Sequence, residues 1–229
     1  IKEVYSGDTS KLDTAQKRLL EQTYTSFIRN GANLVGDDRD EYRKLTERLS
    51  LLAIRFQENN IKDTDAFTLH VTNEDEIDGL PEDVKEAAAN NAKENGKVGW
   101  LFTLHRPSYI PFITFCRNRE LRRQMFLAYS TTCSKGNSFD NREIVKETVN
   151  TRLKLARLLG YNTYSDYILA ERMAQNTDAV FSMLGKLTWS YLPVAQKELQ
   201  EIRALARESE GTGFEFKPWD FAFYGEKLK

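Results

Sequence analysis

The sequence has 229 residues, of which 40% are hydrophobic and 29% are charged, the balance of an ordinary globular protein. Its formal net charge of −1 gives no overall field that would attract nucleic acid or an anionic membrane surface. It has no apolar run of about 18 residues and no apolar leader, so we expect neither a membrane span nor a signal peptide. Two cysteines are too few for a disulfide framework and favour a reducing compartment, so we expect a cytoplasmic protein.

Apolar residues recur at helical spacing in the first sixty residues. Residues 14–30 are predicted to form a helix that is closed by Asn30 and Gly31. A second helix is predicted from Asp37 to Ile61, with acidic residues in its first turn, where the helix dipole favours them. Its apolar residues fall on one face at steps of four, three and four: Leu45, Leu49, Leu52 and Phe56.

Alternation replaces helical spacing in two short stretches within residues 65–104. Asp65–Val71 (DAFTLHV) alternates apolar with other side chains, and Lys97–Leu104 is a second candidate strand. Between them, a helix is predicted to begin at Pro81 and to end before Gly96. The TLHRPSYIPF segment that follows is interpreted as a turn. One small β element is therefore expected within an otherwise helical chain.

Three further helices are predicted after this element. They span Asn118 to about Ser134, Asp140 to Gly160, and a short segment capped by Thr163 and Asp166. The helix that opens at Asp140 has a wide apolar face and ends at Gly160.

A long helix is predicted to begin at Thr177. Pro193 inside it is expected to kink it near Trp189, whose carbonyl loses its hydrogen-bond partner. No repeat of about 33 to 47 residues is visible, which argues against a helical solenoid. The sequence thus predicts a mainly α fold, with residues 1–229 forming a single helical region.

The sequence ends on FKPWDFAFYGEKLK, which crowds four aromatic residues into one short helix. Because an α-helix turns by about 100° per residue, these side chains cannot all face one neighbour. We expect this surface to pack on segments that would follow it, and the chain to be an internal piece of a longer protein. The alternative is that it packs on the chain's own core, helped by the neighbouring helix that begins at Thr177. The four residues are Trp219, Phe221, Phe223 and Tyr224.

The two histidines and two cysteines are the first candidates for chemistry. His70 and His105 could meet if the two strands pair, and Cys116 could join them as a metal ligand. No metal-ligand spacing is present, so histidines with ordinary hydrogen bonds are the favoured interpretation. Cys133 lies near a predicted helix C-terminus, where the dipole raises its pKa, and Cys116 lies among apolar residues. Both thiols are interpreted as structural.

The basic cluster Arg117, Arg119, Arg122 and Arg123 is the strongest charge feature. It could hold a phosphate or a carboxylate, but Glu120 is interleaved and a solvated face is favoured.

The acidic residues Glu74, Asp75, Glu76 and Asp78 lie in a polar connection and are interpreted as a solvated loop or helix cap. No glycine-rich phosphate loop and no nucleophile motif is present. The residues alone therefore assign no catalytic residue and no metal ligand, and leave any substrate-binding residue unidentified.

Several segments, in order, resemble the thimet oligopeptidase and peptidyl-dipeptidase family of zinc metallopeptidases, which includes oligopeptidase A-like enzymes. They are RFQENNIKDTDAFTLHV, DGLPEDVKEAAA, TLHRPSYIPF, DNREIVKETVNTRLKLARLLGY, ERMA and PWDFAFYGEKLK. The likeness covers residues 12–229. RFQENN and TDAF look more like the peptidyl-dipeptidase branch.

The resemblance implies a helical enzyme that cleaves short peptides in a deep channel between two halves. The family's zinc site, an HExxH helix and a later glutamate, lies C-terminal to the PWD-type helix and is absent from this sequence. We therefore expect this chain to supply one wall of the channel, to lack zinc and to be inactive alone, with the catalytic half as its partner. In the longer enzyme, a zinc-bound water would attack the peptide with the HExxH glutamate as general base. The alternatives are a helical interaction scaffold with no catalytic parent and an autonomous metal-binding domain.

Overall fold

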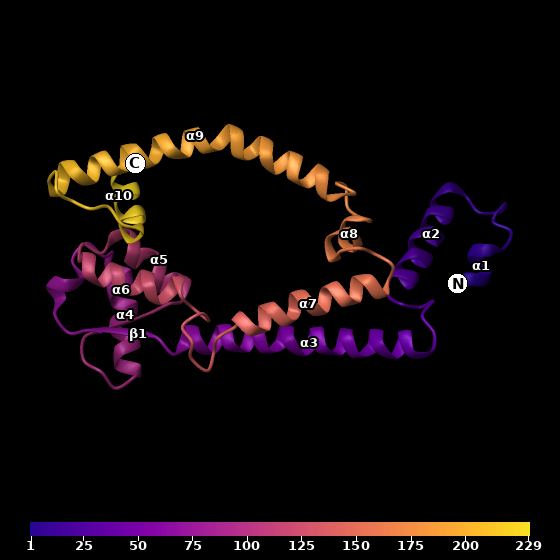
Figure 1. Cartoon of the computed structure of the whole chain (residues 1–229). Helices are drawn as coiled ribbons and strands as arrows, with labels where there is room; N and C mark the ends of the chain where they lie inside the picture. Colours follow the sequence, from indigo (N-terminus) through magenta and orange to yellow (C-terminus); the bar gives the residue numbers. More distant parts are fainter. The chain divides into compact units, whose positions relative to one another are not determined.

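The computed structural model describes residues 1–229 and is mainly α-helical, as the sequence predicts (Figure 1). It contains ten α-helices, two short 3₁₀ helices and one two-stranded sheet. In chain order the elements are α1 (Lys2–Ser6), α2 (Thr14–Arg29), α3 (Gly36–Asp65), β1 (Thr68–Val71), η1 (Glu74–Ile77), α4 (Glu82–Glu94), β2 (Trp100–Thr103), α5 (Arg106–Phe115), α6 (Arg119–Ser130), α7 (Arg142–Leu158), α8 (Tyr164–Leu169), α9 (Thr177–Glu210), η2 (Pro218–Asp220) and α10 (Phe221–Lys227).

The chain divides into two compact units. The first comprises residues 1–54 and 144–181, and the second comprises residues 55–143 and 182–229. The boundaries fall inside α3, near the start of α7 and inside α9. That residues 1–229 form a single region stays a prediction. None of the helices is both long enough and apolar enough to cross a membrane.

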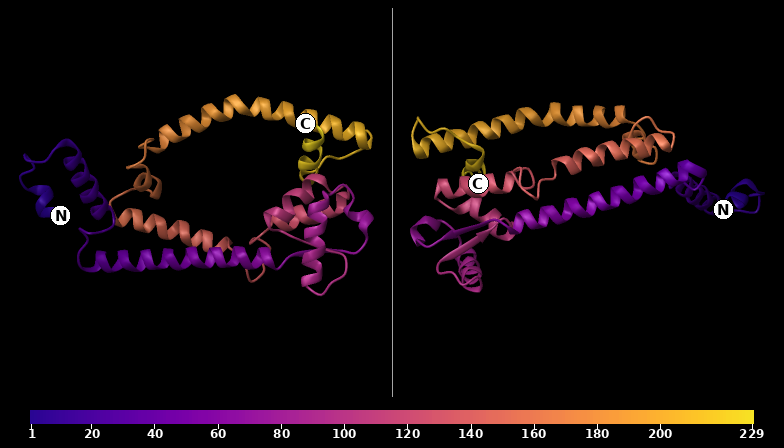
Figure 2. Two further views of the ribbon diagram at one scale, coloured as in Figure 1. Left: turned by 180° about the vertical axis from the view of Figure 1, so that it is seen from behind. Right: turned by 60° about the horizontal axis from the view of Figure 1, so that its bottom comes forward.

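The first unit is held by contacts between segments far apart in the sequence. Both Figure 1 and Figure 2 draw α3 and α7 side by side, and Arg48 of α3 binds both carboxylate oxygens of Glu147 at 2.6 and 2.7 Å. Arg29 ends α2 between two aromatic rings, 5.5 Å from the ring centre of Tyr161 and 4.3 Å from that of Tyr167. Its guanidinium also donates to the Tyr161 hydroxyl and the Tyr167 carbonyl. These contacts join α2 to the segment that contains α8.

The core of the second unit surrounds the small sheet. β1 and β2 are antiparallel, with Leu69 opposite Phe102 and Val71 opposite Trp100. The predicted β element is therefore confirmed, but each strand has only four residues and lies inside the longer range predicted for it. The buried cluster is drawn from both strands, η1, α4, α5, α6 and adjoining loops: Leu69, Val71, Ile77, Leu80, Ala88, Phe102, Leu104, Tyr109, Phe112, Cys116, Leu121 and Met125.

Two glycines are required by close backbone approaches in this unit. Gly99 has a φ of +96°, and a Cβ there would lie 2.3 Å from the carbonyl oxygen of Val71. Gly79 has a φ of +89°, and a Cβ there would lie 2.4 Å from the carbonyl oxygen of Phe115. Both positions exclude larger residues on steric as well as conformational grounds.

The interpretation of TLHRPSYIPF as a turn is wrong, because this segment enters helix α5. Pro107 lies in the first turn, where a missing N–H costs no helical hydrogen bond. Pro111 lies inside the helix and removes one such bond. Tyr109 and Phe112 are both buried by this helix, and their burial outweighs that loss.

The expectation that the C-terminal aromatics pack on later segments is wrong for two of them. Phe223 and Tyr224 of α10 are buried, and they form a cluster with Ile202 and Ala206 of α9. The alternative, packing on the chain's own core with help from the helix that begins at Thr177, is the arrangement observed, because α10 also lies against α5. Phe221 is 52% exposed, so part of the aromatic surface is open.

The other predicted helices are present with small shifts of their ends. α6 ends at Ser130, α7 begins at Arg142, and the Thr163 capping box opens α8. α9 runs through Pro193 as one helix, and its ribbon is arched rather than straight (Figure 1). The proline and the arch agree with the expected disturbance of the helix axis.

Candidate functional site

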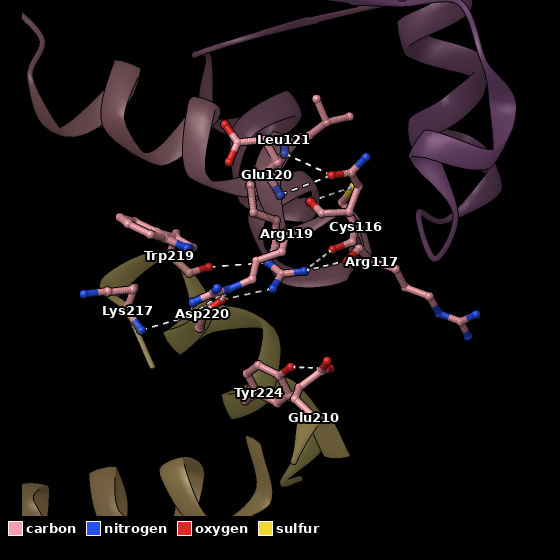
Figure 3. Close-up of polar contacts among 12 residues, drawn as sticks. Cys116, Arg117, Arg119, Glu120, Leu121, Glu210, Lys217, Trp219, Asp220 and Tyr224 are labelled. Atoms are coloured by element: carbon pink, nitrogen blue, oxygen red, sulfur yellow. Dashed lines mark hydrogen bonds and ion pairs between the residues drawn. The ribbon is translucent and has the colours of Figure 1, made fainter. Parts of the chain in front are cut away.

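The arginine cluster lies at the beginning of α6, which the sequence around it defines clearly. Asn118 caps the helix, and its side-chain oxygen accepts hydrogen bonds from the N–H groups of Glu120 and Leu121 (Figure 3). Arg119 and Arg122 follow at a spacing of three residues, so both can reach the same neighbouring segment. That segment is η2, which begins with Pro218.

Asp220 is the centre of the site. Its carboxylate is fully buried and accepts from Arg119 Nη2 at 2.7 Å and from Arg122 Nη2 at 3.2 Å (Figure 3). Arg119 Nε adds a bond of 3.0 Å, and the backbone N–H of Lys217 adds one of 2.9 Å. The carboxylate therefore receives charge-assisted bonds from two guanidinium groups and one backbone amide.

The electrostatics of the site follow from burial and pairing. Burial alone would raise the pKa of Asp220, but the hydrogen bonds from Arg119 and the Lys217 N–H outweigh it and lower that pKa below its ordinary value. Burial lowers the pKa of Arg122, and its bond to Asp220 opposes the change. Arg122 and Asp220 thus form a buried ion pair, which is strongly destabilising to break from one side.

The donor groups of Arg122 are directed at partners within the chain. Nη1 donates to the carbonyls of Cys116 at 2.8 Å and Arg117 at 3.0 Å, and Nε donates to the Trp219 carbonyl at 3.4 Å. Its guanidinium carbon lies 4.0 Å from the ring centre of Phe223. Arg122 therefore fixes α10 and the segment before α6 to one another.

A second polar contact secures α10 to α9. The Tyr224 hydroxyl donates to Oε1 of Glu210 at 2.7 Å (Figure 3). Burial and this carboxylate both raise the pKa of Tyr224, so the phenol stays protonated at neutral pH.

The sequence interpretation of this cluster was partly right. Arg117 forms an exposed pair with Asp78, and Arg123 forms one with Glu120, as a solvated face requires. It was wrong for Arg122, which is 1% exposed. The cluster does hold a carboxylate, as the competing hypothesis allowed, but the carboxylate is Asp220 of the same chain.

Asp220 itself was missed as a partner. A single aspartate after proline and tryptophan resembles a helix cap, and 101 positions separate it from Arg119. The signal that could have found it is the placement of an acidic residue inside an otherwise aromatic helix start, because a buried carboxylate needs a cationic partner.

The histidines do not combine into a metal site. His70 Nε2 lies 2.7 Å from the carbonyl oxygen of Val98, and His105 Nε2 lies 2.9 Å from Oδ1 of Asp65. No group of three histidine, cysteine or acidic residues is placed to hold a metal ion.

The thiols and the acidic run have structural surroundings. Burial raises the pKa of Cys116 to about 11, and burial followed by the charge of Asp63 raises that of Cys133. The direction expected for Cys133 is therefore confirmed, but its causes are burial and the charge of Asp63 rather than the helix dipole. The residues Glu74, Asp75, Glu76 and Asp78 are exposed, which confirms their interpretation as a solvated connection.

The chain is similar to a family of peptidases and to several named enzymes. The family model described as peptidase family M3 matches residues 112–229, just over half of the chain. Oligopeptidase A of Haemophilus influenzae is 36% identical over 98% of this chain and 33% of its own length. Oligopeptidase A of Escherichia coli is 36% identical over 95% of this chain and 32% of its own length.

The dipeptidyl carboxypeptidase of Escherichia coli is 28% identical over 95% of this chain and 32% of its own length. The chain thus spans about a third of the length of the curated relatives it matches. The higher identity to the two oligopeptidases A does not favour the peptidyl-dipeptidase branch that RFQENN and TDAF had indicated.

Proposed function

The chain belongs to peptidase family M3, and on that premise we propose that it forms part of a zinc metallopeptidase that hydrolyses short peptides. The observation that carries the proposal is the family match over residues 112–229. The names of the relatives, oligopeptidase A and dipeptidyl carboxypeptidase, support peptides as the substrate class. A reducing, cytoplasmic location is consistent with two free, buried cysteines.

The residues of this chain do not fit a zinc site. Both histidines are exposed and engaged with Val98 or Asp65, and neither has further ligand-type residues around it. The sequence has no HExxH motif. We propose that the zinc ligands and the catalytic groups come from another part of the enzyme, and we assign no catalytic step to a residue of this chain.

The proposed contribution of this chain is to restrict which substrates reach the catalytic groups. Helices held by buried contacts, such as the Asp220 site, would form one wall of a channel that admits only short, unfolded peptides. The apolar surface of α9 supports contact with further protein, because Trp189 is 85% exposed and Leu187 and Tyr191 are exposed beside it. The proposed partner is the catalytic half of the same enzyme.

The test is to express the uninterrupted open reading frame that contains this sequence. We expect an HExxH motif in it, and zinc-dependent cleavage of internally quenched peptides of about ten residues that a chelator abolishes and added zinc restores. A reading frame with no HExxH motif and no peptide cleavage would instead support the helical interaction scaffold, for which the exposed face of α9 would be the contact surface.

A further inference from the structure

The two edges of the small sheet differ, and the edge of β2 is closed. Ser108 Oγ accepts a hydrogen bond of 3.0 Å from the backbone N–H of Thr103, and Asn91 Nδ2 donates one of 2.9 Å to the carbonyl of Leu101. These side chains come from α5 and α4. Because β1 lies on the other side of β2, the polar backbone groups of Thr103 and Leu101 point away from β1.

This orientation also fixes which groups of β1 face outward. In an antiparallel pair, residues opposite one another point their N–H and C=O groups either toward each other or both away. Thr68 lies opposite Thr103 and His70 lies opposite Leu101, so the backbone groups of Thr68 and His70 point out of the sheet. Neither residue's N–H or C=O has a hydrogen-bond partner outside the strand pair.

The outer edge of β1 is also accessible. Thr68 and His70 are exposed, whereas Leu69 and Val71 are buried in the core. The ring of His70 is held by the Val98 carbonyl. Two donors and two acceptors therefore alternate along an exposed strand edge, a pattern that an extended backbone complements.

We propose that the outer edge of β1 binds an extended peptide as a third, antiparallel strand. The inference rests on the proposed function in taking a peptide as the ligand. A second copy of this chain is a poorer occupant, because an edge of four residues buries far less than the roughly 1,200 Å² of a stable interface. A short peptide needs only the few backbone bonds that Thr68 and His70 supply.

Charge selects the antiparallel direction. η1 begins three residues after β1 ends, and its carboxylates Glu74, Asp75 and Glu76 are exposed and take part in no ion pair. The amino terminus of an antiparallel peptide lies at this end of β1, whereas a parallel peptide would bring its carboxylate there. The site therefore favours a free α-amino group.

The test is nuclear magnetic resonance of the full 229-residue chain with the peptide Thr-Val-Thr-Val-Thr-amide, which has a free amino terminus. We expect shifts centred on the amides of Thr68 and His70, and slower hydrogen exchange at both. Two versions of the peptide, N-methylated at alternate amides, separate backbone pairing from side-chain contact. One should bind normally and the other about tenfold more weakly, because only one set of amides faces β1.

A protein variant provides the matched comparison. His70→Pro removes an outward N–H, which a sheet edge tolerates, and should weaken binding about tenfold, while Thr68→Val keeps the backbone and should bind normally. Acetylation of the peptide's amino terminus should weaken binding a few-fold at low salt.

Chemical-shift changes centred elsewhere in the chain, or equal binding of both methylated peptides, would overturn the proposal. Cleavage by the longer enzyme without binding at β1 would reject this inference alone, and binding without cleavage would reject only the proposed function.

Discussion

Arg119 Nη2 lies 2.7 Å from Oδ2 of Asp220, although 101 positions separate the two residues in the sequence. Arg122 approaches the same carboxylate from one turn further along α6. The pair of arginines thereby connects the beginning of α6 to the segment that opens the last helix of the chain.

Loss of the Asp220 carboxylate should strongly destabilise the second unit. Asp220→Ala leaves the buried guanidinium of Arg122 without its counter-charge, and we expect the free energy of unfolding to fall by about 3 kcal/mol. Urea denaturation followed by tryptophan fluorescence measures the change. The control is Asp78→Ala, which breaks the exposed pair with Arg117 and should cost less than about 1 kcal/mol. Equal losses in the two variants would show that burial does not strengthen the Asp220 site.

The contribution of Asp220 should disappear in acid. Its pKa is lower in the folded chain than its ordinary value of 3.8, so protons bind the unfolded chain more readily than the folded one. The stabilisation from this carboxylate is fully present at pH values above its ordinary pKa of 3.8. It is lost as the pH falls through the lower pKa of the folded state. We expect the stability difference between the wild type and Asp220→Asn to be largest near neutral pH and to shrink below about pH 4. A difference that grows in acid would mean that the carboxyl is protonated in the folded chain.

This chain alone should bind no stoichiometric zinc and should cleave no peptide. The reason is that its histidines have other partners and its sequence contains no HExxH motif. Elemental analysis after dialysis against zinc-free buffer, with a quenched-peptide assay on the same sample, checks both statements. One tightly held zinc ion per chain, lost in His70→Ala or His105→Ala, would revive the metal-binding alternative.

Substitution of Gly99 should damage the small sheet. A Cβ at this position would meet the Val71 carbonyl oxygen at 2.3 Å, and the positive φ adds strain, so Gly99→Ala should destabilise the chain by about 2 kcal/mol or more. Gly96→Ala is the matched control, because its φ is also positive but no atom lies within 4 Å of the added Cβ. The excess loss in Gly99→Ala over Gly96→Ala isolates the steric contact, and no excess would contradict it.

Removal of the last helix should increase self-association. A chain that ends at Gly213 uncovers Ile202 and Ala206 of α9, which are otherwise covered by Phe223 and Tyr224. Light scattering of the two chains at equal concentration measures the effect. If the exposed part of the C-terminal aromatic surface drove association, truncation would instead reduce it. That result would favour the expectation that the C-terminal helix packs on segments that follow it in a longer protein.

Local patterns predicted the helices and strands of this chain well, because helix caps and apolar periodicity act over a few residues. Thr163 with Asp166, and the alternation through Leu69 and Val71, are examples. The failures came from long-range packing. α5 forms despite Pro111 because its aromatic face is buried. Arg122 has the sequence pattern of an exposed residue, but in the folded chain η2 places Asp220 next to it. Sequence patterns also could not show which edge of the sheet is open. The edge of β2 is closed by side chains of α4 and α5, and these reach it only in the folded chain.

The shielding of Arg122 has a consequence for ionic strength. Dissolved ions screen the exposed pair of Arg117 with Asp78, whose side chains are 69% and 57% accessible, but they cannot enter between Arg122 and Asp220. Concentrated sodium chloride should therefore leave α10 attached to α6 while it weakens the surface pairs. The chain can therefore be washed in concentrated sodium chloride to remove loosely bound charged contaminants while its C-terminal helix stays attached.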